Sequence, residues 1–142
     1  MSEQLTADAR CGVMDLIAGY VRSLEAGDLE GYLDRFTRDG VFEVRDRRYE
    51  GREDIRALVS HLYAIGQDGP GGNRHVLGLP HITGTSQACE ALTYVAILPG
   101  QGAAGGRTCS FAQYADRMVR DEGRWRFAHR RLVVISRGGA GG

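Results

Sequence analysis

The sequence predicts an α+β fold in which three amphipathic helices precede a series of long antiparallel strands. Apolar residues recur at helical spacing in two stretches before residue 37 and in a third that begins near residue 52. Four segments of strand-like composition then follow one another between residues 74 and 136. Helices and strands that occupy separate blocks of the chain, instead of alternating, are typical of the α+β class.

The first two helices are expected to meet at a tight corner. Residues 1–10 are polar and form the loosely docked start of the first helix, which we expect to run to about Ala26. Gly27 can adopt the left-handed conformation that ends a helix. Asp28 can cap the next helix, expected from about Leu29 to Thr37, because its carboxylate accepts N–H groups of the first turn. The two apolar stripes consist of Val13, Leu16, Ile17, Tyr20 and Leu24, and of Leu29, Tyr32, Leu33 and Phe36.

The third helix is expected to begin near Arg52, after a short strand at 41–44 and a solvated hairpin corner at 45–48. Glu53 and Asp54 lie in its first turn, where acidic side chains interact favourably with the helix dipole. Its apolar face consists of Ile55, Leu58, Val59 and Leu62.

A glycine-rich segment at 66–73 separates the helices from the long strands. It lacks the Gly-Lys-Ser/Thr ending of a phosphate-binding loop, so we interpret it as a flexible connection or a lid over a pocket. We expect residues 1–136 to form one domain, because 142 residues suit one hydrophobic core. Strands are expected at about 74–84, 87–98, 107–121 and 124–136, with a mobile loop at 99–106 and a disordered tail at 137–142.

Composition argues against several classes of function. The formal net charge is zero, so no basic field exists to bind nucleic acid, and no apolar run approaches the length that spans a membrane. The first residues do not resemble a signal peptide. Three cysteines at wide spacing fit free thiols in a reducing cytoplasm better than a disulfide framework. All eighteen Lys+Arg residues are arginine, which excludes lysine Schiff bases and P-loop chemistry.

The histidines favour acid–base chemistry over metal binding. None of the four shows metal-ligand spacing to another, and no cysteine pair lies beside one, so we expect a site without metal or cofactor. His75 is the leading candidate, because it opens a strand on the same face as Leu77 and Leu79. An imidazole can take or give a proton near neutral pH. The alternative for His75 is a half-buried residue that only hydrogen-bonds the backbone.

Four motifs, in this order, resemble the SnoaL-like branch of the NTF2-like superfamily. They are the helix corner Ala26-Gly27-Asp28, the third-helix entry Tyr49-Glu50-Gly51-Arg52-Glu53-Asp54-Ile55, Arg74-His75 before an apolar strand, and the hairpin Gly123-Arg124-Trp125-Arg126-Phe127. The superfamily includes polyketide cyclases, scytalone dehydratase, bile-acid dehydratase and ketosteroid isomerase. The resemblance covers nearly the whole chain. It implies a cone-shaped α+β barrel, with three N-terminal helices packed on a curved, mostly antiparallel sheet.

The resemblance also implies roles for Tyr20, Glu25 and His75. The dehydratases have a pocket histidine at the position of His75 and a pocket tyrosine at that of Tyr20. Tyr20 is then expected to polarise a substrate carbonyl, and Glu25, which stands where bile-acid dehydratase has an aspartate, to partner His75. From the residues alone, a core aromatic is the default interpretation of Tyr20. A solvated surface acid fits Glu25 at least as well as a catalytic partner. Val44 occupies the position of the aspartate base of ketosteroid isomerase, so that chemistry is not expected in its known form.

Further residues are expected to contact a small apolar substrate. Tyr94 and Tyr114 could point into the cone from neighbouring strands, although packing roles fit them equally well. His129 follows the face of Trp125 and Phe127 by strand alternation. The complete set of expected substrate contacts is Tyr94, Tyr114, His129, Phe36, Leu58 and Leu62.

The resemblance thus predicts a small cytoplasmic enzyme of secondary metabolism that dehydrates, cyclises or isomerises an apolar polyketide- or polycycle-like substrate. Two alternatives stay open: a non-catalytic ligand-binding module, and an association domain like the small subunit of ring-hydroxylating dioxygenases. Strands 87–98 and 107–121 carry apolar residues in both phases, which further predicts a homodimer through the outer face of the sheet. No nucleic-acid or membrane partner is expected.

Overall fold

The computed structural model describes residues 4–101 and 109–138 of the chain. Within these residues the chain forms three helices and a seven-stranded sheet. The helices are α1 (Ala7–Ala26), α2 (Leu29–Asp34) and α3 (Gly51–Ala64), and the strands are β1 (Phe36–Val44), β2 (Arg47–Glu50), β3 (Arg74–Leu77), β4 (His81–Gly84), β5 (Ala88–Leu98), β6 (Ser110–Asp121) and β7 (Arg124–Arg137).

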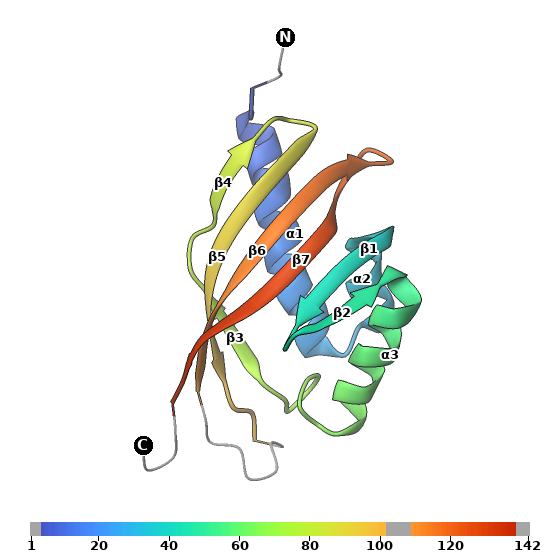
Figure 1. The fold of residues 1–142 in the computed structure, drawn as a ribbon, viewed down its shortest axis with the longest axis vertical. Coiled ribbons are helices and arrows are strands. Elements are labelled where there is room, and N and C mark those ends of the chain that lie inside the picture. Colours follow the sequence, from blue (N-terminus) through green and yellow to red (C-terminus); the bar gives the residue numbers. More distant parts are fainter. Residues whose placement is uncertain (1–3, 102–108, 139–142) are drawn as a thin grey trace.

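The sheet is curved and mixed, and its strand order is β2-β1-β7-β6-β5-β3, with β4 also paired to β5. β1 runs parallel to β7, whereas the other neighbouring strands are antiparallel. Figure 1 shows α1 crossing one face of β5, β6 and β7, while α3 lies beside the β1–β2 hairpin. The predicted α+β class is confirmed, but β1 and β2 stand between α2 and α3, so only two of the three helices precede the first strand.

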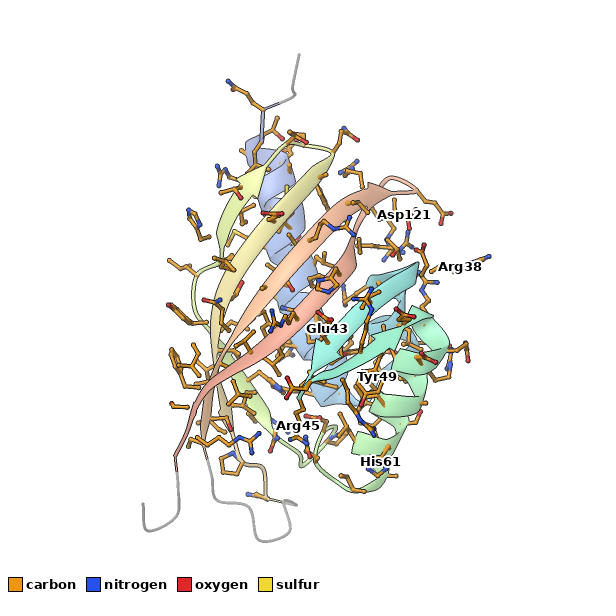
Figure 2. All side chains as sticks on the ribbon, viewed as in Figure 1. Arg38, Glu43, Arg45, Tyr49, His61 and Asp121 are labelled. Carbon is orange, nitrogen blue, oxygen red and sulfur yellow. The ribbon has the colours of Figure 1, made fainter. Side chains whose placement is uncertain are left out.

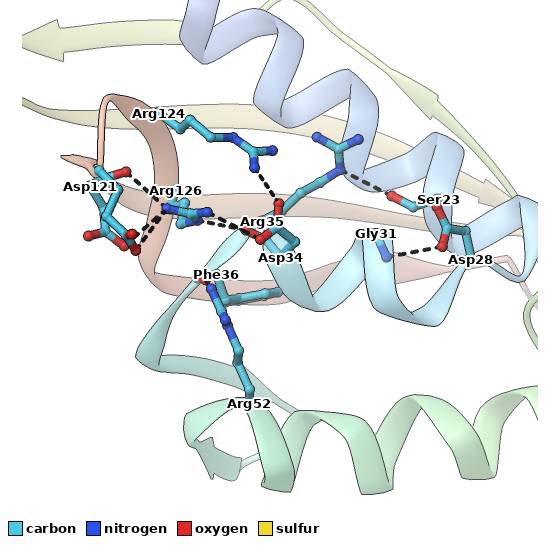
Figure 3. A network of polar contacts seen from close by, with 11 residues as sticks. Ser23, Asp28, Gly31, Asp34, Arg35, Phe36, Arg52, Asp121, Arg124 and Arg126 are labelled. Carbon is cyan, nitrogen blue, oxygen red and sulfur yellow. Dashed lines mark hydrogen bonds and ion pairs between the residues drawn. The ribbon is translucent and has the colours of Figure 1, made fainter.

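The corner between α1 and α2 has the predicted chemistry. Gly27 ends α1 in the left-handed conformation, with φ 76°. The Asp28 carboxylate accepts the Gly31 N–H at 3.0 Å and caps α2, as Figure 3 shows. Glu25 is thereby held in the last turn of α1, directly before the chain changes direction.

An aromatic cluster joins α1 to the inner face of the sheet. The Tyr20 ring lies 5.8 Å from Tyr114 of β6 and 5.7 Å from Phe127 of β7, both edge-on. Phe36 packs 5.5 Å from Phe127 and has no exposed surface. Large, fully buried rings in mutual contact remove much apolar surface from water and so stabilise the packing of α1 on the sheet.

The helix–strand boundary near residue 35 differs from the prediction. α2 ends at Asp34 and β1 already begins at Phe36, whereas helix was expected to Thr37 and strand from residue 41. The Arg35 carbonyl accepts the Phe127 N–H at 2.7 Å. The Phe36 carbonyl accepts Arg52 Nη2 at 2.6 Å, as Figure 3 shows. These long-range partners replace the bonds that another helical turn would make.

Two other boundaries also differ. The strand expected at 74–84 is divided into β3 and β4 by residues 78–80, and the register against β5 shifts by one residue across the break. Pro80 cannot donate a ladder hydrogen bond, which explains the interruption. In the predicted disordered tail, Arg137 ends β7 and the Gly138 N–H donates to the Cys109 carbonyl at 2.7 Å. Residues 102–108 and 139–142, which include the rest of that tail and most of the expected 99–106 loop, lie outside the described residues.

The predicted hairpin corner at 45–48 is shorter than expected. Arg47 and Arg48 belong to β2, and the turn consists of Arg45 and Asp46, both with positive φ, at 55° and 60°. This mirror-image turn matches the twist of an antiparallel pair but is more often built from Asn and Gly. It places Arg45 at one end of a cavity described next.

Candidate functional site

A cavity of about 700 Å³ opens among the end of α1, α3, the β1–β2 hairpin, β3 and the ends of β5, β6 and β7. Its apolar wall includes Leu24, Phe42, Val44, Leu58, Leu62 and Leu132. Its polar wall includes His75 and Asp68. Arg45 and Tyr49 of the β1–β2 hairpin and His61 of α3, which Figure 2 labels, also line it. A mainly apolar chamber with a few polar groups is the usual form of a small-molecule site.

His75 lines this cavity and is paired with Glu25, which is not among the described residues that line it. The same carboxylate oxygen, Oε2, accepts the His75 backbone N–H at 2.7 Å and lies 3.1 Å from His75 Nδ1. The side chains are 16% and 5% exposed, so both are largely withdrawn from water. The Glu25 carboxylate fixes the ring orientation and favours the tautomer with hydrogen on Nδ1. Nε2 is then left with a lone pair that can accept a proton from a ligand.

The fold positions this pair through two local features. Gly27 stops α1 immediately after Glu25, so the carboxylate projects from the helix end toward β3. Arg74, beside His75, brings Nε to 3.8 Å of Glu25 Oε1 and donates from Nη1 to the Gly72 carbonyl at 3.0 Å. An acid at a helix C-terminus opposes the helix dipole, and the pairing with His75 and Arg74 offsets that cost.

Asp68 is a functional candidate that the sequence did not reveal. It lines the cavity, is 7% exposed, and lies in the 66–73 segment that was interpreted only as a connection or lid. Burial raises the pKa of its carboxyl; the charge of His75 acts in the opposite direction, and Glu25 raises it further. The available signal was an acid between glycines just before the histidine strand, which is too common to identify a site.

Tyr20 lies beside the cavity rather than on its wall. It is 2% exposed, its hydroxyl accepts from Tyr32 Oη at 2.6 Å, and it is not among the described residues that line the cavity. Burial raises the pKa of Tyr20 well above its usual value. The structure therefore does not bring its hydroxyl together with His75, and its expected role in binding a carbonyl stays a prediction.

Tyr114, Leu58 and Leu62 line the cavity, but the other expected substrate contacts do not. Tyr94 is 54% exposed, and its ring centroid lies 5.3 Å from that of Phe111 on the outer face. It points outward because side chains alternate along β5 and its two neighbours face the core. Phe36 is in the aromatic cluster, away from the cavity wall. The expectation that Tyr94 and Phe36 contact a substrate in the cavity is therefore wrong.

The expected placement of His129 among the substrate contacts is also wrong, and a β-bulge is the reason. Arg117 pairs with His129 while Met118 pairs with Phe127, so Ala128 is an extra residue in β7. The alternation that starts at Phe127 is shifted by one, and the inward residues become Arg130 and Leu132. His129 faces the other way, where its Nε2 lies 2.9 Å from Glu43 Oε2. Glu43 is thus paired outside the cavity, while its neighbour Val44 lines it.

Arg130 forms a buried cation behind Tyr114. Its guanidinium carbon lies 3.6 Å from the Tyr114 ring centroid and 4.1 Å from that of Tyr20, and Nε donates to Asp116 Oδ1 at 2.9 Å. Burial raises the pKa of Asp116 to about 6, against the influence of Arg130. Nη1 and Nη2 of Arg130 have no hydrogen-bond partner among the described residues. The cation fixes the ring that Tyr114 presents to the cavity.

The described residues contain no group of three or more His, Cys, Asp or Glu side chains arranged to hold a metal ion. In the same part of the chain, no helix is long and apolar enough to cross a membrane. Cys11, Cys89 and Cys109 are free thiols.

Comparison with known proteins gives a family and a set of similar folds. The model of the SnoaL-like domain matches residues 6–131. A comparison with curated proteins finds no match. Among solved structures, a protein from Catenulispora acidiphila in complex with S-DNPA is 26% identical, with a TM-score of 0.77 over 91% of this chain and 95% of that one.

Two more distant structures share the fold. A candidate scytalone dehydratase from Novosphingobium aromaticivorans is 15% identical, with a TM-score of 0.82 over 95% of this chain and 92% of that one. A hexachlorocyclohexane dehydrochlorinase, LinA type 2, is also 15% identical, with a TM-score of 0.81 over 94% and 90%. Because the family model spans most of the chain, this protein belongs to the SnoaL-like family.

Proposed function

We propose that this protein is a lyase that needs no cofactor and removes a proton from carbon to start an elimination on a small apolar substrate. The observation that carries the proposal is His75 on the cavity wall, with the Glu25 carboxylate 3.1 Å from its Nδ1. A carboxylate on Nδ1 orients the imidazole and stabilises the imidazolium that forms when Nε2 takes a proton. Cyclisation and isomerisation begin with the same proton transfer and are the neighbouring possibilities.

The size and lining of the cavity support a polycyclic or polyketide-like substrate. Its volume of about 700 Å³ lies within the range of small-molecule sites. Leu24, Leu58, Leu62 and Leu132 present branched apolar surface to a flat, carbon-rich ligand. The names of two structural neighbours, a dehydratase and a dehydrochlorinase, denote eliminations; at 15% identity they support the fold, and the chemistry rests on the residues here.

The test uses a β-hydroxy ketone with a naphthyl group on the β-carbon, whose loss of water gives a conjugated enone that absorbs strongly. The parent protein should accelerate this loss. His75→Ala should lower kcat by roughly 10²–10⁴-fold, the usual contribution of a general acid or base. Glu25→Gln should also lower kcat. The loss of kcat in the double variant should be much smaller than the combined losses of the two single variants, because the two residues act as one unit.

Tyr20→Phe is the informative comparison, because it removes one hydroxyl from the tyrosine beside the cavity. We expect a smaller loss of kcat than for His75→Ala, since that hydroxyl is bonded to Tyr32 in the structure. If the parent binds the ketone without turning over this or related carbonyl substrates, the protein is a ligand-binding module and the proposed lyase activity is wrong. Unchanged turnover in folded His75→Ala removes His75 from the mechanism.

A further inference from the structure

Asp68 is a largely buried residue whose carboxyl accepts no hydrogen bond from the described part of the chain. It is 7% exposed, and no described N–H or O–H group lies within hydrogen-bonding distance of its side chain. Buried carboxylates normally accept several hydrogen bonds, because desolvation of the charge is otherwise costly. An acid that lacks donors and faces a cavity is therefore suited to carry a proton there.

The backbone holds Asp68 in place. The Gln67 and Asp68 N–H groups both donate to the Leu62 carbonyl, at 3.0 and 3.3 Å, and the Asn73 N–H donates to the Gln67 carbonyl at 2.8 Å. A Cβ on Gly72 would come within 2.7 Å of the Asp68 backbone, so only glycine allows this close approach. The segment is a compact, hydrogen-bonded turn that fixes the carboxyl at the cavity wall.

Charged and titratable groups face Asp68 from every element around it. His75 of β3 and Arg45 of the β1–β2 turn favour its ionised form, while Glu25 of α1 opposes it. The tyrosine hydroxyls whose pKa values Asp68 helps to raise belong to Tyr20, Tyr32, Tyr63 and Tyr114, on α1, α2, α3 and β6. Burial outweighs the influence of His75 and Arg45, so the pKa of Asp68 is raised above that of an ordinary carboxyl.

We infer that Asp68 is the general acid of this site, and that the substrates are β-hydroxy carbonyl compounds, whose oxygen leaving group must be protonated as it departs. This inference rests on the proposed lyase function and adds to it the second proton-transfer group and the kind of leaving group. Hydroxide is a poor leaving group and needs an acid, whereas a halide does not.

The proton transfers balance. His75 Nε2 takes the proton from the carbon next to the carbonyl, and the electrons of that C–H bond form the new C=C bond. The C–O bond at the β-carbon breaks, its electron pair stays on oxygen, and that oxygen takes the proton of Asp68 and leaves as water. The Asp68 carboxylate and the His75 imidazolium then return to their starting states by exchanging one proton through solvent.

The experiment compares two leaving groups on one scaffold. The first probe is the naphthyl β-hydroxy ketone, and the second carries para-nitrophenoxide in place of the hydroxyl, a leaving group that needs no protonation. Asp68→Asn should lower kcat for the hydroxy probe by roughly 10²–10⁴-fold and leave kcat for the nitrophenoxy probe within a few-fold. His75→Ala should slow both probes. Asp15→Asn makes the same chemical change on an exposed residue of α1 and should affect neither.

The pH profile provides a readout that a purely structural role would not change. Turnover of the hydroxy probe by the parent should fall as pH rises through the pKa of Asp68, and this fall should be absent in Asp68→Asn. Arg45→Gln should move the fall to higher pH, because it removes a positive charge that favours the Asp68 carboxylate. An infrared titration of the parent against Asp68→Asn should show this carboxyl keeping its proton above the ordinary aspartate pKa of about 3.9.

The outcomes separate the two proposals. Equal loss on both probes in Asp68→Asn, or an infrared titration at the ordinary carboxyl value, overturns the acid role of Asp68 while leaving the lyase proposal intact. Absence of turnover of both probes by the parent overturns the lyase proposal and the assignment of Asp68 with it.

Discussion

Arg126 and Asp68 are equally buried charged residues, 6% and 7% exposed, but their surroundings are opposite. Arg126 donates to the Asp34 carbonyl at 2.9 Å, to Asp34 Oδ1 at 3.1 Å and to the Asp121 carbonyl at 2.9 Å, as Figure 3 shows. Asp68 has no described donor at all. The first residue joins the β6–β7 hairpin to the end of α2, and the second faces the cavity.

The difference distinguishes charge used for stability from charge available to a ligand. A fully satisfied buried cation rigidifies the elements that it bonds, whereas an unsatisfied buried acid costs stability until something binds it. Charged residues that break the rule of polar satisfaction are expected to concentrate at functional sites. The predictions below, from the largest expected effect to the smallest, test whether this contrast holds.

Replacement of Arg126 should give the largest loss of stability. Arg126→Met keeps the apolar stem but removes the fork that bonds two carbonyls and Asp34, and hydrogen bonds to charged groups contribute about 1.5–3 kcal/mol. We expect a decrease of about 2–3 kcal/mol in the free energy of unfolding, measured with urea. At urea concentrations too low to unfold the variant, kcat should be unchanged. Arg117→Met, on the exposed face of β6, is the control. A loss no larger than that of the control would show that the network contributes nothing.

The outer face of the sheet provides a third environment, in which apolar groups are exposed. Tyr94 is 54% and Phe111 41% exposed, and the two rings stack on each other. We propose that a second copy of the chain covers this face. Tyr94→Glu should then raise the dimer dissociation constant at least tenfold, about 1.4 kcal/mol, because it places a charge in an apolar contact. Sedimentation velocity measures this, and a monomeric parent at micromolar concentration contradicts it.

Asp68→Asn should change stability in the opposite direction from Arg126→Met. An amide removes the cost of a buried carboxylate near neutral pH, so we expect the free energy of unfolding to rise by about 0.5–2 kcal/mol, the range of typical stabilising substitutions. The gain should shrink at low pH, where the parent carboxyl is already protonated. Destabilisation at neutral pH would mean that Asp68 is a satisfied structural acid, and the contrast with Arg126 would fail.

The smallest expected effect concerns the free energy of unfolding at low pH. Burial opposes ionisation of Asp34, but the hydrogen bond from Arg126 and the charges of Arg124 and Arg126 outweigh it and lower the pKa of Asp34. A lowered pKa means that this pairing stabilises the fold above the unfolded-state value and that the contribution disappears as pH falls through the folded-state value. The decline of unfolding free energy toward low pH should therefore be shallower in Arg126→Met. Parallel curves for variant and parent would contradict this.

Much of the fold could be predicted from the sequence because its signals are local. Helical spacing predicted α1 and α3, and the Gly27-Asp28 corner predicted that α1 ends just after Glu25. The resemblance to dehydratases pointed to Glu25 and His75, and the structure brings them within hydrogen-bonding distance. The role of this pair is what the kinetic experiments test.

The failures have non-local causes. A single extra residue at Ala128 shifts the phase of β7, so His129 and Arg130 exchange faces, and nothing in the local sequence marks that bulge. The burial of Asp68 depends on packing among α1, α3 and β3, which periodicity cannot report. Cavity residues contributed by loops are therefore harder to find than those on regular elements.

The parallel pairing of β1 with β7 has a consequence for how the protein is made. Phe36 pairs with Phe127 and Val44 with Leu132, so β1 meets its partner only after the β3–β6 region has been synthesised. On the ribosome, β1 must wait with one edge unpaired while the later strands emerge, and pairings between distant segments form slowly. The β1–β2 hairpin and α3 can assemble early, but the wall that Leu132 and Val134 contribute to the cavity arrives late. A nascent chain halted before β7 would thus expose the edge of β1 to chaperones and to other chains.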